Sequence, residues 1–329
     1  MIEKNAKNTG RKKFNLSSLL SISGFGVVIA YILLCVLLTF LSRNFLTINN
    51  FITIIRQAVW VGVMGIGMTF VIATGGIDLS VGSTLGFAGL TVAVLLQKGI
   101  EVFPACLIAM LIGAFIGLIN GLLISKVKLP AFIATLGTMS ILRGLVYVYT
   151  KGIPVYGLRY PAFQYLAQGY FYGIPFPVIL MAVLLLIFSF LMYRTKFGRY
   201  VLAIGSNEDG ARLVGIDIDK IKIWVYILTG FLCSISGILL TSRSEAAVAD
   251  AGSGYEMDAI AASVIGGTSM SGGKANLPAM FLGAVLMTTI RNGLNLTGVS
   301  SLWHQVVLGF VILIAVTMDS LSTRLLRKE

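Results

Sequence analysis

Asp78 is the residue whose chemistry fits its surroundings least. It is the only charged residue in the apolar stretch 57–97, and a carboxylate within hydrocarbon costs about 2.5–3.5 kcal/mol on insertion scales. Gly75 and Gly76 precede it and Ser80 follows, which predicts a break in the helix. Irregular backbone at membrane depth is tolerated only where protein or a water-filled cavity surrounds it. The stretch is therefore part of a polar solute path or its gate, or a turn in which Asp78 caps the next helix, and the two roles are compatible.

A second glycine-rich stretch, 266–274, repeats the spacing of the first. Both contain Gly-Gly-x-x-x-Ser-x-Gly, and Ser269 and Ser271 stand where the first copy has Asp78 and Ser80. Apolar segments that glycines interrupt at corresponding places point to a transport site. We predict that the two breaks pack near one another and flank a path. A chance match among the 37 glycines is the alternative.

The other reactive side chains do not assemble into a catalytic or metal-binding set. The stretch 266–274 is not a phosphate-binding loop, because Thr268 stands where that motif needs glycine and Ala275 where it needs Ser or Thr. The chain has one histidine, His304, so neither a Ser–His–acid triad nor a metal cluster with several histidines can be built. We predict no metal, no cofactor and no enzymatic activity in this chain.

The composition is that of a membrane protein. Of the 329 residues, 57% are hydrophobic and only 12% are charged, whereas a typical soluble domain has about 25% charged residues. The apolar runs are continuous rather than alternating, which argues against a β-barrel. Cys35, Cys106 and Cys233 lie inside such runs, where packing is their expected role. The net charge of +12 fits the cytoplasmic excess of Lys and Arg in membrane proteins, so we predict no nucleic-acid partner.

These runs predict an all-α, polytopic helical membrane protein of about ten transmembrane helices with Gly-rich helix breaks. Lengths near 20 residues suit a hydrocarbon core about 30 Å thick. Glycine pairs interrupt the eighth and ninth helices. The predicted spans are 22–41, 52–73, 80–97, 104–125, 130–150, 174–193, 223–241, 257–272, 277–294 and 302–318.

The distribution of Lys and Arg predicts the orientation of the chain. If both termini are cytoplasmic, most of the 25 Lys and Arg residues lie on the inner side. They are concentrated in a basic N-terminal segment, 1–21, a long loop, 194–222, and a tail, 319–329. The membrane domain between them spans 22–318.

A few polar and small residues within the spans need an explanation. The row Gly113, Gly117 and Gly121 has helical spacing, and we interpret it as a surface where two helix backbones approach closely. Asn120 beside it is either a helix–helix hydrogen bond, which we favour, or a contact to a polar solute. Arg291 lies deep in a span, where an interfacial role and a functional charge are both open. Two further arginines lie nearer span ends, where side chains reach the interface: Arg56 and Arg143.

The long inner loop contains the signals of a short helix. Asn207 is a favourable N-cap, and Glu208 and Asp209 follow at the positive end of the helix dipole. Arg212 lies in the last turn and Gly215 ends the helix. A solvated connector does not need a capped helix of about two turns. We therefore favour a lever that another protein moves over a plain connector.

Several stretches together resemble a known family. They are NFLTINN (44–50), GMT (67–69) leading into GIDLSVGS (76–83), PAFIATL (130–136), GRY (198–200), GYEMDAIAA (254–262), GGTSMSGGK (266–274) and NGLN (292–295). They cover the chain from about residue 44 to 318. They resemble the permease subunits of bacterial ABC importers for monosaccharides, the ribose-type family.

The resemblance implies a subunit of an ATP-driven importer in the bacterial cytoplasmic membrane. Two permease copies, or one copy and a close paralogue, would form the path within lipid. A cytoplasmic ABC ATPase would hold ATP and Mg, and an outer sugar-binding protein would deliver a ribose-like monosaccharide. The alternative, a self-sufficient ion-coupled secondary transporter, would need several intramembrane carboxylates or a cation site, and only Asp78 is available.

The resemblance also assigns roles to residues. Segment 198–222 occupies the place of the ATPase-docking loop, although Asp209 and Gly210 stand where the family has alanines. The expected docking residues are Asn207, Glu208, Asp209, Ala211, Arg212 and Gly215. The candidates for the translocation path or its gate are Gly75, Gly76, Asp78, Ser80, Asn120, Ser269, Ser271, Asn292 and Asn295.

Overall fold

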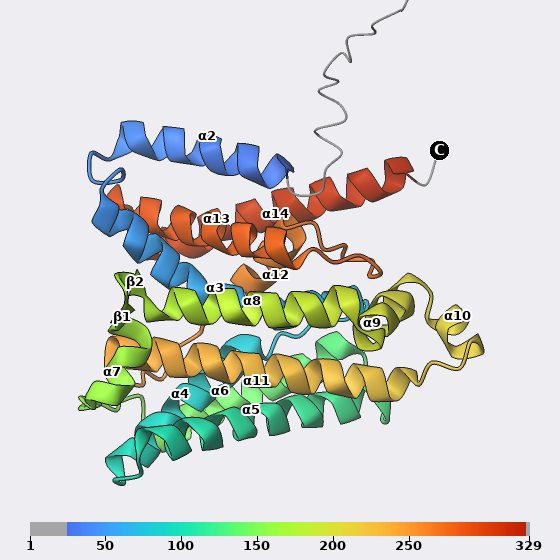
Figure 1. Cartoon of the computed structure of the whole chain (residues 1–329), viewed down its shortest axis with the longest axis horizontal. Helices are drawn as coiled ribbons and strands as arrows, with labels where there is room; N and C mark the ends of the chain where they lie inside the picture. The colour runs from blue at the N-terminus through green and yellow to red at the C-terminus, as the bar shows by residue number, and fades with distance from the viewer. Residues whose placement is uncertain (1–24, 327–329) are drawn as a thin grey trace, which may run out of the picture.

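The computed structural model describes residues 25–326. The predicted N-terminal segment, 1–21, and the last three residues of the predicted tail lie outside the described residues. Long helices run side by side in one bundle (Figure 1). They are α2 (Phe25–Leu41), α3 (Ile48–Ala73), α4 (Val81–Gln97), α5 (Val102–Ser125), α6 (Ala131–Thr150), α8 (Phe176–Arg194), α11 (Ile218–Ser244), α13 (Leu277–Leu296) and α14 (Ser301–Leu326).

Short elements occupy the two ends of the bundle and one position within it. At one end lie α7 (Pro161–Gln168) and a hairpin of β1 (Tyr170–Phe171) and β2 (Ile174–Pro175). At the other end lie α9 (Lys196–Ser206) and α10 (Glu208–Leu213) (Figure 1). The last short helix, α12 (Tyr255–Ile265), packs against α3 and α13. The helical prediction is confirmed, apart from the small hairpin, which the sequence analysis missed.

The predicted number of ten spans is not confirmed. Six helices are long and apolar enough to cross a membrane within residues 25–326: α3, α5, α6, α8, α11 and α13. Shorter apolar segments are 27–41 in α2, 81–97 in α4 and 302–314 in α14. Helix α14 continues to Leu326, into the predicted tail, and α8 begins only at Phe176 because the two preceding residues form β2.

The predicted eighth span, 257–272, is wrong. Helix α12 has 11 residues, so it is about 16 Å long at 1.5 Å per residue and crosses about half of a 30 Å hydrocarbon layer. It ends at Ile265 because Gly266 and Gly267 follow, and Gly267 has a φ of +91°. A helix cannot continue through this left-handed conformation.

Helices α3 and α11 form the centre of the bundle. Every residue of α3 from Ala58 to Ala73 is buried. Two side chains of α11 bond to the backbone of α3: Ser236 Oγ donates to the Trp60 carbonyl at 2.9 Å, and Thr229 Oγ1 to the Gly67 carbonyl at 3.2 Å. These bonds join the two helices and satisfy polar groups in an apolar interior.

The glycine row of α5 confirms its predicted role in packing. Gly117 faces the backbone of α11 at Tyr226, and any Cβ added at Gly117 would collide with that backbone. Gly113 and Gly121 face α11 in the same way, at Gly230 and Ile223. The opposite side of α5 exposes large apolar residues, as expected for a surface in contact with lipid: Leu111, Phe115, Ile119 and Leu122.

Candidate transport path

The first glycine break connects α3 to α4, and Asp78 stabilises it. The carboxylate is 3% exposed, and its Oδ1 accepts hydrogen bonds from Ser80 N at 2.8 Å and Ser80 Oγ at 2.6 Å. Helix α4 begins at the next residue, Val81. The predicted capping turn is therefore present, and the Asp78 carboxylate is bonded within the protein.

A chain of buried polar groups extends from this turn to two other helices. Asn120 of α5 donates from Nδ2 to Ser80 Oγ at 2.9 Å, and its Oδ1 accepts from Thr138 Oγ1 of α6 at 2.6 Å. The Leu79 amide donates to Thr135 Oγ1 at 3.1 Å. The interpretation of Asn120 as a helix–helix hydrogen bond is confirmed. The sequence analysis missed both threonines, although their spacing of three residues places them on one face of α6.

The second break lies against the end of α3, as predicted. The Gly273 amide donates to the Ala73 carbonyl at 3.0 Å, one residue before the first break begins. Ser269 and Ser271 bond within their own stretch: the Ser269 carbonyl accepts from the Gly272 amide at 2.9 Å, and Ser269 Oγ from the Ser271 amide at 3.3 Å. The two breaks are therefore neighbours in space.

The first break and α10 line the same cavity, which has a volume of about 330 Å³. Gly75 and Gly76 form part of its wall, together with Glu208 of α10 and Lys222 of α11. The hydroxyl of Tyr226, which also lines the cavity, lies against Gly76 and has no hydrogen-bond partner within the described part of the chain. Glu208 of α10 and the first break therefore face the same space.

Helix α10 has the caps that the sequence predicts. Asn207 Oδ1 accepts from the Gly210 amide at 2.8 Å, and Gly215 follows the helix with a φ of +82°. Ala211 is buried, whereas Leu213 and Val214 are 88% and 76% exposed. The sequence analysis did not single out this exposed apolar pair, because nothing local distinguishes it from core residues.

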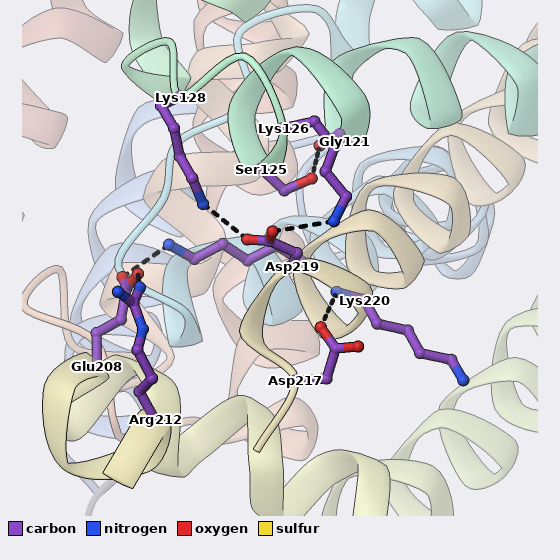
Figure 2. Close-up of polar contacts among 10 residues, drawn as sticks. Gly121, Ser125, Lys126, Lys128, Glu208, Arg212, Asp217, Asp219 and Lys220 are labelled. Carbon is purple, nitrogen blue, oxygen red and sulfur yellow. Dashed lines mark hydrogen bonds and ion pairs between the residues drawn. The ribbon is translucent and has the colours of Figure 1, made fainter. Parts of the chain in front are cut away.

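One ion pair connects α10 to the start of α11, and others lie beside it (Figure 2). Glu208 Oε2 lies 2.7 Å from Lys222 Nζ, and Glu208 Oε1 lies 3.5 Å from Arg212 Nη2. Asp219 of α11 pairs with two lysines that follow α5, Lys126 at 3.1 Å and Lys128 at 2.8 Å (Figure 2). These charges join α10, α11 and the α5–α6 connection at one end of the bundle.

The two asparagines of α13 lie apart from Asp78. Asn292 Nδ2 donates to Asn50 Oδ1 at 2.8 Å, near the first residue of α3. Asp78 lies at the other end of α3, beyond its last residue. Asn295 lines a separate cavity near the end of α11. Since α3 has 26 residues and is about 39 Å long, the predicted site residues form one group at each end of the bundle.

Comparison with known proteins identifies the family. Residues 50–316 match the family model described as branched-chain amino acid transport system / permease component. The chain belongs to this family of permeases. It is therefore a multi-pass membrane protein, in agreement with its apolar helices.

The relatives of this permease are similar over almost their whole length. It is 45% identical to the ribose import permease RbsC of Bacillus subtilis over 296 residues, which are 89% of this chain and 92% of the relative. It is 42% identical over the same shares to RbsC of Escherichia coli K12. RbsC of Haemophilus influenzae is 38% identical over 295 residues, covering 89% of this chain and 91% of the relative. No solved structure matches the chain.

The charged side chains within the described part of this permease bond mainly to nearby protein groups. Within residues 25–326, no group of three or more His, Cys, Asp or Glu residues is arranged to hold a metal ion. Arg143 Nη1 donates to the Ala251 carbonyl at 2.7 Å, and Arg56 lies 4.5 Å from the centre of the Tyr170 ring. Both arginines therefore fix loops at the end of the bundle that carries α7.

Proposed function

We propose that this permease is the membrane subunit of an ATP-driven ABC importer that carries ribose, or a monosaccharide like it, into the cytoplasm. Its 45% and 42% identity to two ribose import permeases over about nine-tenths of each chain supports this substrate class. The ATP-hydrolysing subunit is a separate protein, and ATP and Mg are held there. An outer sugar-binding protein delivers the sugar.

The position of α10 is the observation that carries the proposal. This helix is capped, protrudes at one end of the bundle and exposes Leu213 and Val214. Its Glu208 bonds to Lys222 at 2.7 Å in a cavity whose wall includes Gly75 and Gly76. A partner that pushes α10 can therefore act on α11 through the Glu208–Lys222 pair, beside the cavity that the first break lines.

The mechanism that follows is mechanical. Closure of the ATPase on ATP moves α10, and the Glu208–Lys222 pair passes the movement to α11. Helix α11 packs against α3, α4 and α5, so its displacement changes the packing around the first break. The bonds from Asp78 to Ser80 and from Ser80 to Asn120 hold the break closed until this displacement separates them.

The assembly and orientation follow from the same proposal. Two copies of this chain, or one copy and a close paralogue, surround the path in the cytoplasmic membrane. Helices α9 and α10 and both termini face the cytoplasm, and α7 with its hairpin faces outward. The docking set comprises Asn207, Glu208, Asp209, Ala211, Arg212 and Gly215, and the path or gate set comprises Gly75, Gly76, Asp78, Ser80, Asn120, Ser269, Ser271, Asn292 and Asn295.

An ion-coupled transporter is the less favoured function. Such a protein uses carboxylates that are free to exchange cations or protons within the membrane. Here Asp78 is bonded to Ser80, and Asp258 is paired with Arg291. Both carboxylates are therefore held by bonds within the protein, which disfavours ion coupling.

The function can be tested by reconstitution. The permease would be purified from native membrane with its associated proteins and placed in liposomes with the sugar-binding protein outside. We expect labelled ribose to accumulate only with ATP inside, and an ATPase subunit to co-purify. Accumulation that follows an ion gradient and needs no ATP would contradict the proposal.

A further inference from the structure

A second cavity lies at the end of the bundle opposite α10, with a volume of about 290 Å³. It is lined by residues from the ends of several helices, among them Arg243 in the last turn of α11 and Asn295 in the last turn of α13. The Arg243 carbonyl accepts a hydrogen bond from Gln168 Nε2 of α7 at 3.4 Å, so the cavity lies beside α7. We propose that this cavity binds one neutral monosaccharide molecule, so that the permease holds the sugar before it reaches the gate.

Polar groups without partners line this cavity. Asp258 is 1% exposed, and its Oδ2 lies 2.7 Å from Arg291 Nη2 and accepts from Arg291 Nε at 2.8 Å. Its other oxygen, Oδ1, is buried and has no partner within residues 25–326, and the same is true of His304 Nε2. An unpaired buried polar atom costs about 1–3 kcal/mol, and a sugar hydroxyl can donate to one such atom and accept from another.

Two aromatic rings are held in place by arginines in the same cavity. The guanidinium of Arg243 lies 5.7 Å from the centre of the Trp60 ring, and that of Arg291 lies 5.4 Å from the centre of the Tyr255 ring. Rigid aromatic rings offer large contact areas at a low cost in conformational entropy. The apolar face of a sugar ring fits against such a surface while its hydroxyls bond to the polar groups around the rim.

The size and charge of the cavity define the class of ligand. Its volume of about 290 Å³ is at the lower limit of ligand sites, which are about 300–1,000 Å³, and suits a single sugar better than an oligosaccharide. The lining contains one carboxylate, that of Asp258, and two guanidinium groups, those of Arg243 and Arg291. This balance disfavours a metal cation, and the polar groups that remain, Gln57, Thr288 and Asn295, bond to neutral hydroxyls.

The position of the cavity connects it to the second break. Tyr255 and Asp258 belong to α12, which ends at Ile265 directly before Gly266 and Gly267. A sugar bound at the first turn of this short helix would press on an element whose other end leads to the contact between Gly273 and Ala73. The inference rests on the proposed function, because it assumes that a monosaccharide is the transported solute.

The test measures sugar binding separately from transport. The full-length permease with its ATPase would be placed in lipid nanodiscs, and binding of millimolar D-ribose followed by saturation-transfer NMR. We expect Arg243→Leu and Asn295→Leu each to reduce the ribose signal at least fivefold. The matched controls Arg43→Leu and Asn44→Leu change exposed residues between α2 and α3, outside the cavity, and should stay within twofold of the original protein.

Two results would overturn the assignment of the cavity. One is an unchanged ribose signal in both cavity variants, provided that the ATPase still co-purifies with them. The other is stronger binding of ribose 5-phosphate than of ribose, since the cavity would then be an anion site. If the wild type still shows ATP-driven uptake, these results reject only the assignment of the cavity as a sugar site. The proposed function is then unaffected.

Tryptophan fluorescence gives a second measurement that leaves the cavity unaltered. Replacing Trp224 and Trp303 by Phe leaves Trp60 as the only tryptophan, since the chain has three. We expect D-ribose to change its emission with a saturable dependence on concentration. An emission spectrum that does not respond to ribose, in a protein that still binds its ATPase, would exclude a sugar beside Trp60.

Discussion

At the scale of single residues, the buried polar side chains near the first break are few and hydrogen-bond to one another. Asp78 shows how a carboxylate is stabilised in an apolar bundle. Its Oδ1 accepts two hydrogen bonds from Ser80, and Ser80 Oγ in turn accepts one from Asn120 Nδ2. Each of these groups would be costly alone in a low-dielectric interior. Their cost is offset only while the network is complete, which makes the network suitable as a gate.

The first prediction concerns the Asp78 carboxylate. Asp78→Ala should reduce ATP-dependent ribose uptake at least tenfold, because the Ser80 amide and hydroxyl lose their acceptor at the start of α4. Asp78→Asn keeps an oxygen acceptor and should retain more uptake than Asp78→Ala. Both rates would be measured in vesicles, with co-purification of the ATPase as the control for assembly. Full accumulation of sugar by Asp78→Ala would refute the assigned role.

At the scale of elements, glycine and charge decide how helices meet. Glycine in α5 brings its backbone against α11, where association in lipid depends on close packing rather than on the hydrophobic effect. The Glu208–Lys222 ion pair then links this packed pair to α10. In the proposed mechanism, a displacement of α10 would therefore reach α5 through packed helices.

Gly117 provides a test of this packing. Gly117→Ala should lower the melting temperature in detergent by several degrees, because the new Cβ would collide with the backbone at Tyr226 and overpacking costs about 1–3 kcal/mol. Gly137→Ala in α6 is the matched control, since nothing lies within 4 Å of its added Cβ. Melting would be followed by size-exclusion chromatography after heating. Equal melting temperatures for the two variants would contradict the role of the row.

Leu213 tests the docking surface of α10. Leu213→Asp should abolish co-purification of the ATPase, because a charge would replace an apolar contact on a residue that is 88% exposed. Tyr172→Asp changes a side chain that is 92% exposed at the opposite end of the bundle and should leave co-purification unaltered. Retention of the ATPase by Leu213→Asp would show that the docking surface lies elsewhere.

At the scale of the whole molecule, the two ends of the bundle have different chemistry. One end carries α9, α10 and the paired lysines, Lys126 and Lys128. The other carries α7, the hairpin and the cavity that contains Asp258 and Arg291. A solute that enters beside α7 would meet the cavity first and the break at Asp78 later.

The orientation of the bundle can be tested by labelling single cysteines. The three native cysteines, which are free, would be replaced by alanine, and Tyr172→Cys and Val214→Cys introduced separately. A membrane-impermeant maleimide added to intact spheroplasts should label the Tyr172→Cys protein. The Val214→Cys protein should react only after the membrane is permeabilised. Labelling of Val214→Cys from outside would reverse the proposed topology.

Much of this permease is determined by sequence alone, because its signals are local. Continuous apolar runs predict helices in lipid, and Asn207 and Gly215 predict both ends of α10 with the correct caps. The glycine row of α5 predicts a packing surface, and Asp78 predicts a capped break. Each of these inferences depends on residues within one or two turns of one another.

Tertiary structure decided what depends on contacts between distant segments. Asp258 and Arg291 are 33 residues apart and form an ion pair only because α12 and α13 pack together. Thr138 completes the network at Asp78 because α6 lies beside α4 and α5. The glycine pair in the predicted eighth span signalled an interruption, but only the structure shows that the backbone turns left-handed at Gly267 and ends α12 there. Composition and caps act along one helix, whereas polar pairing and cavities arise from the packing of several.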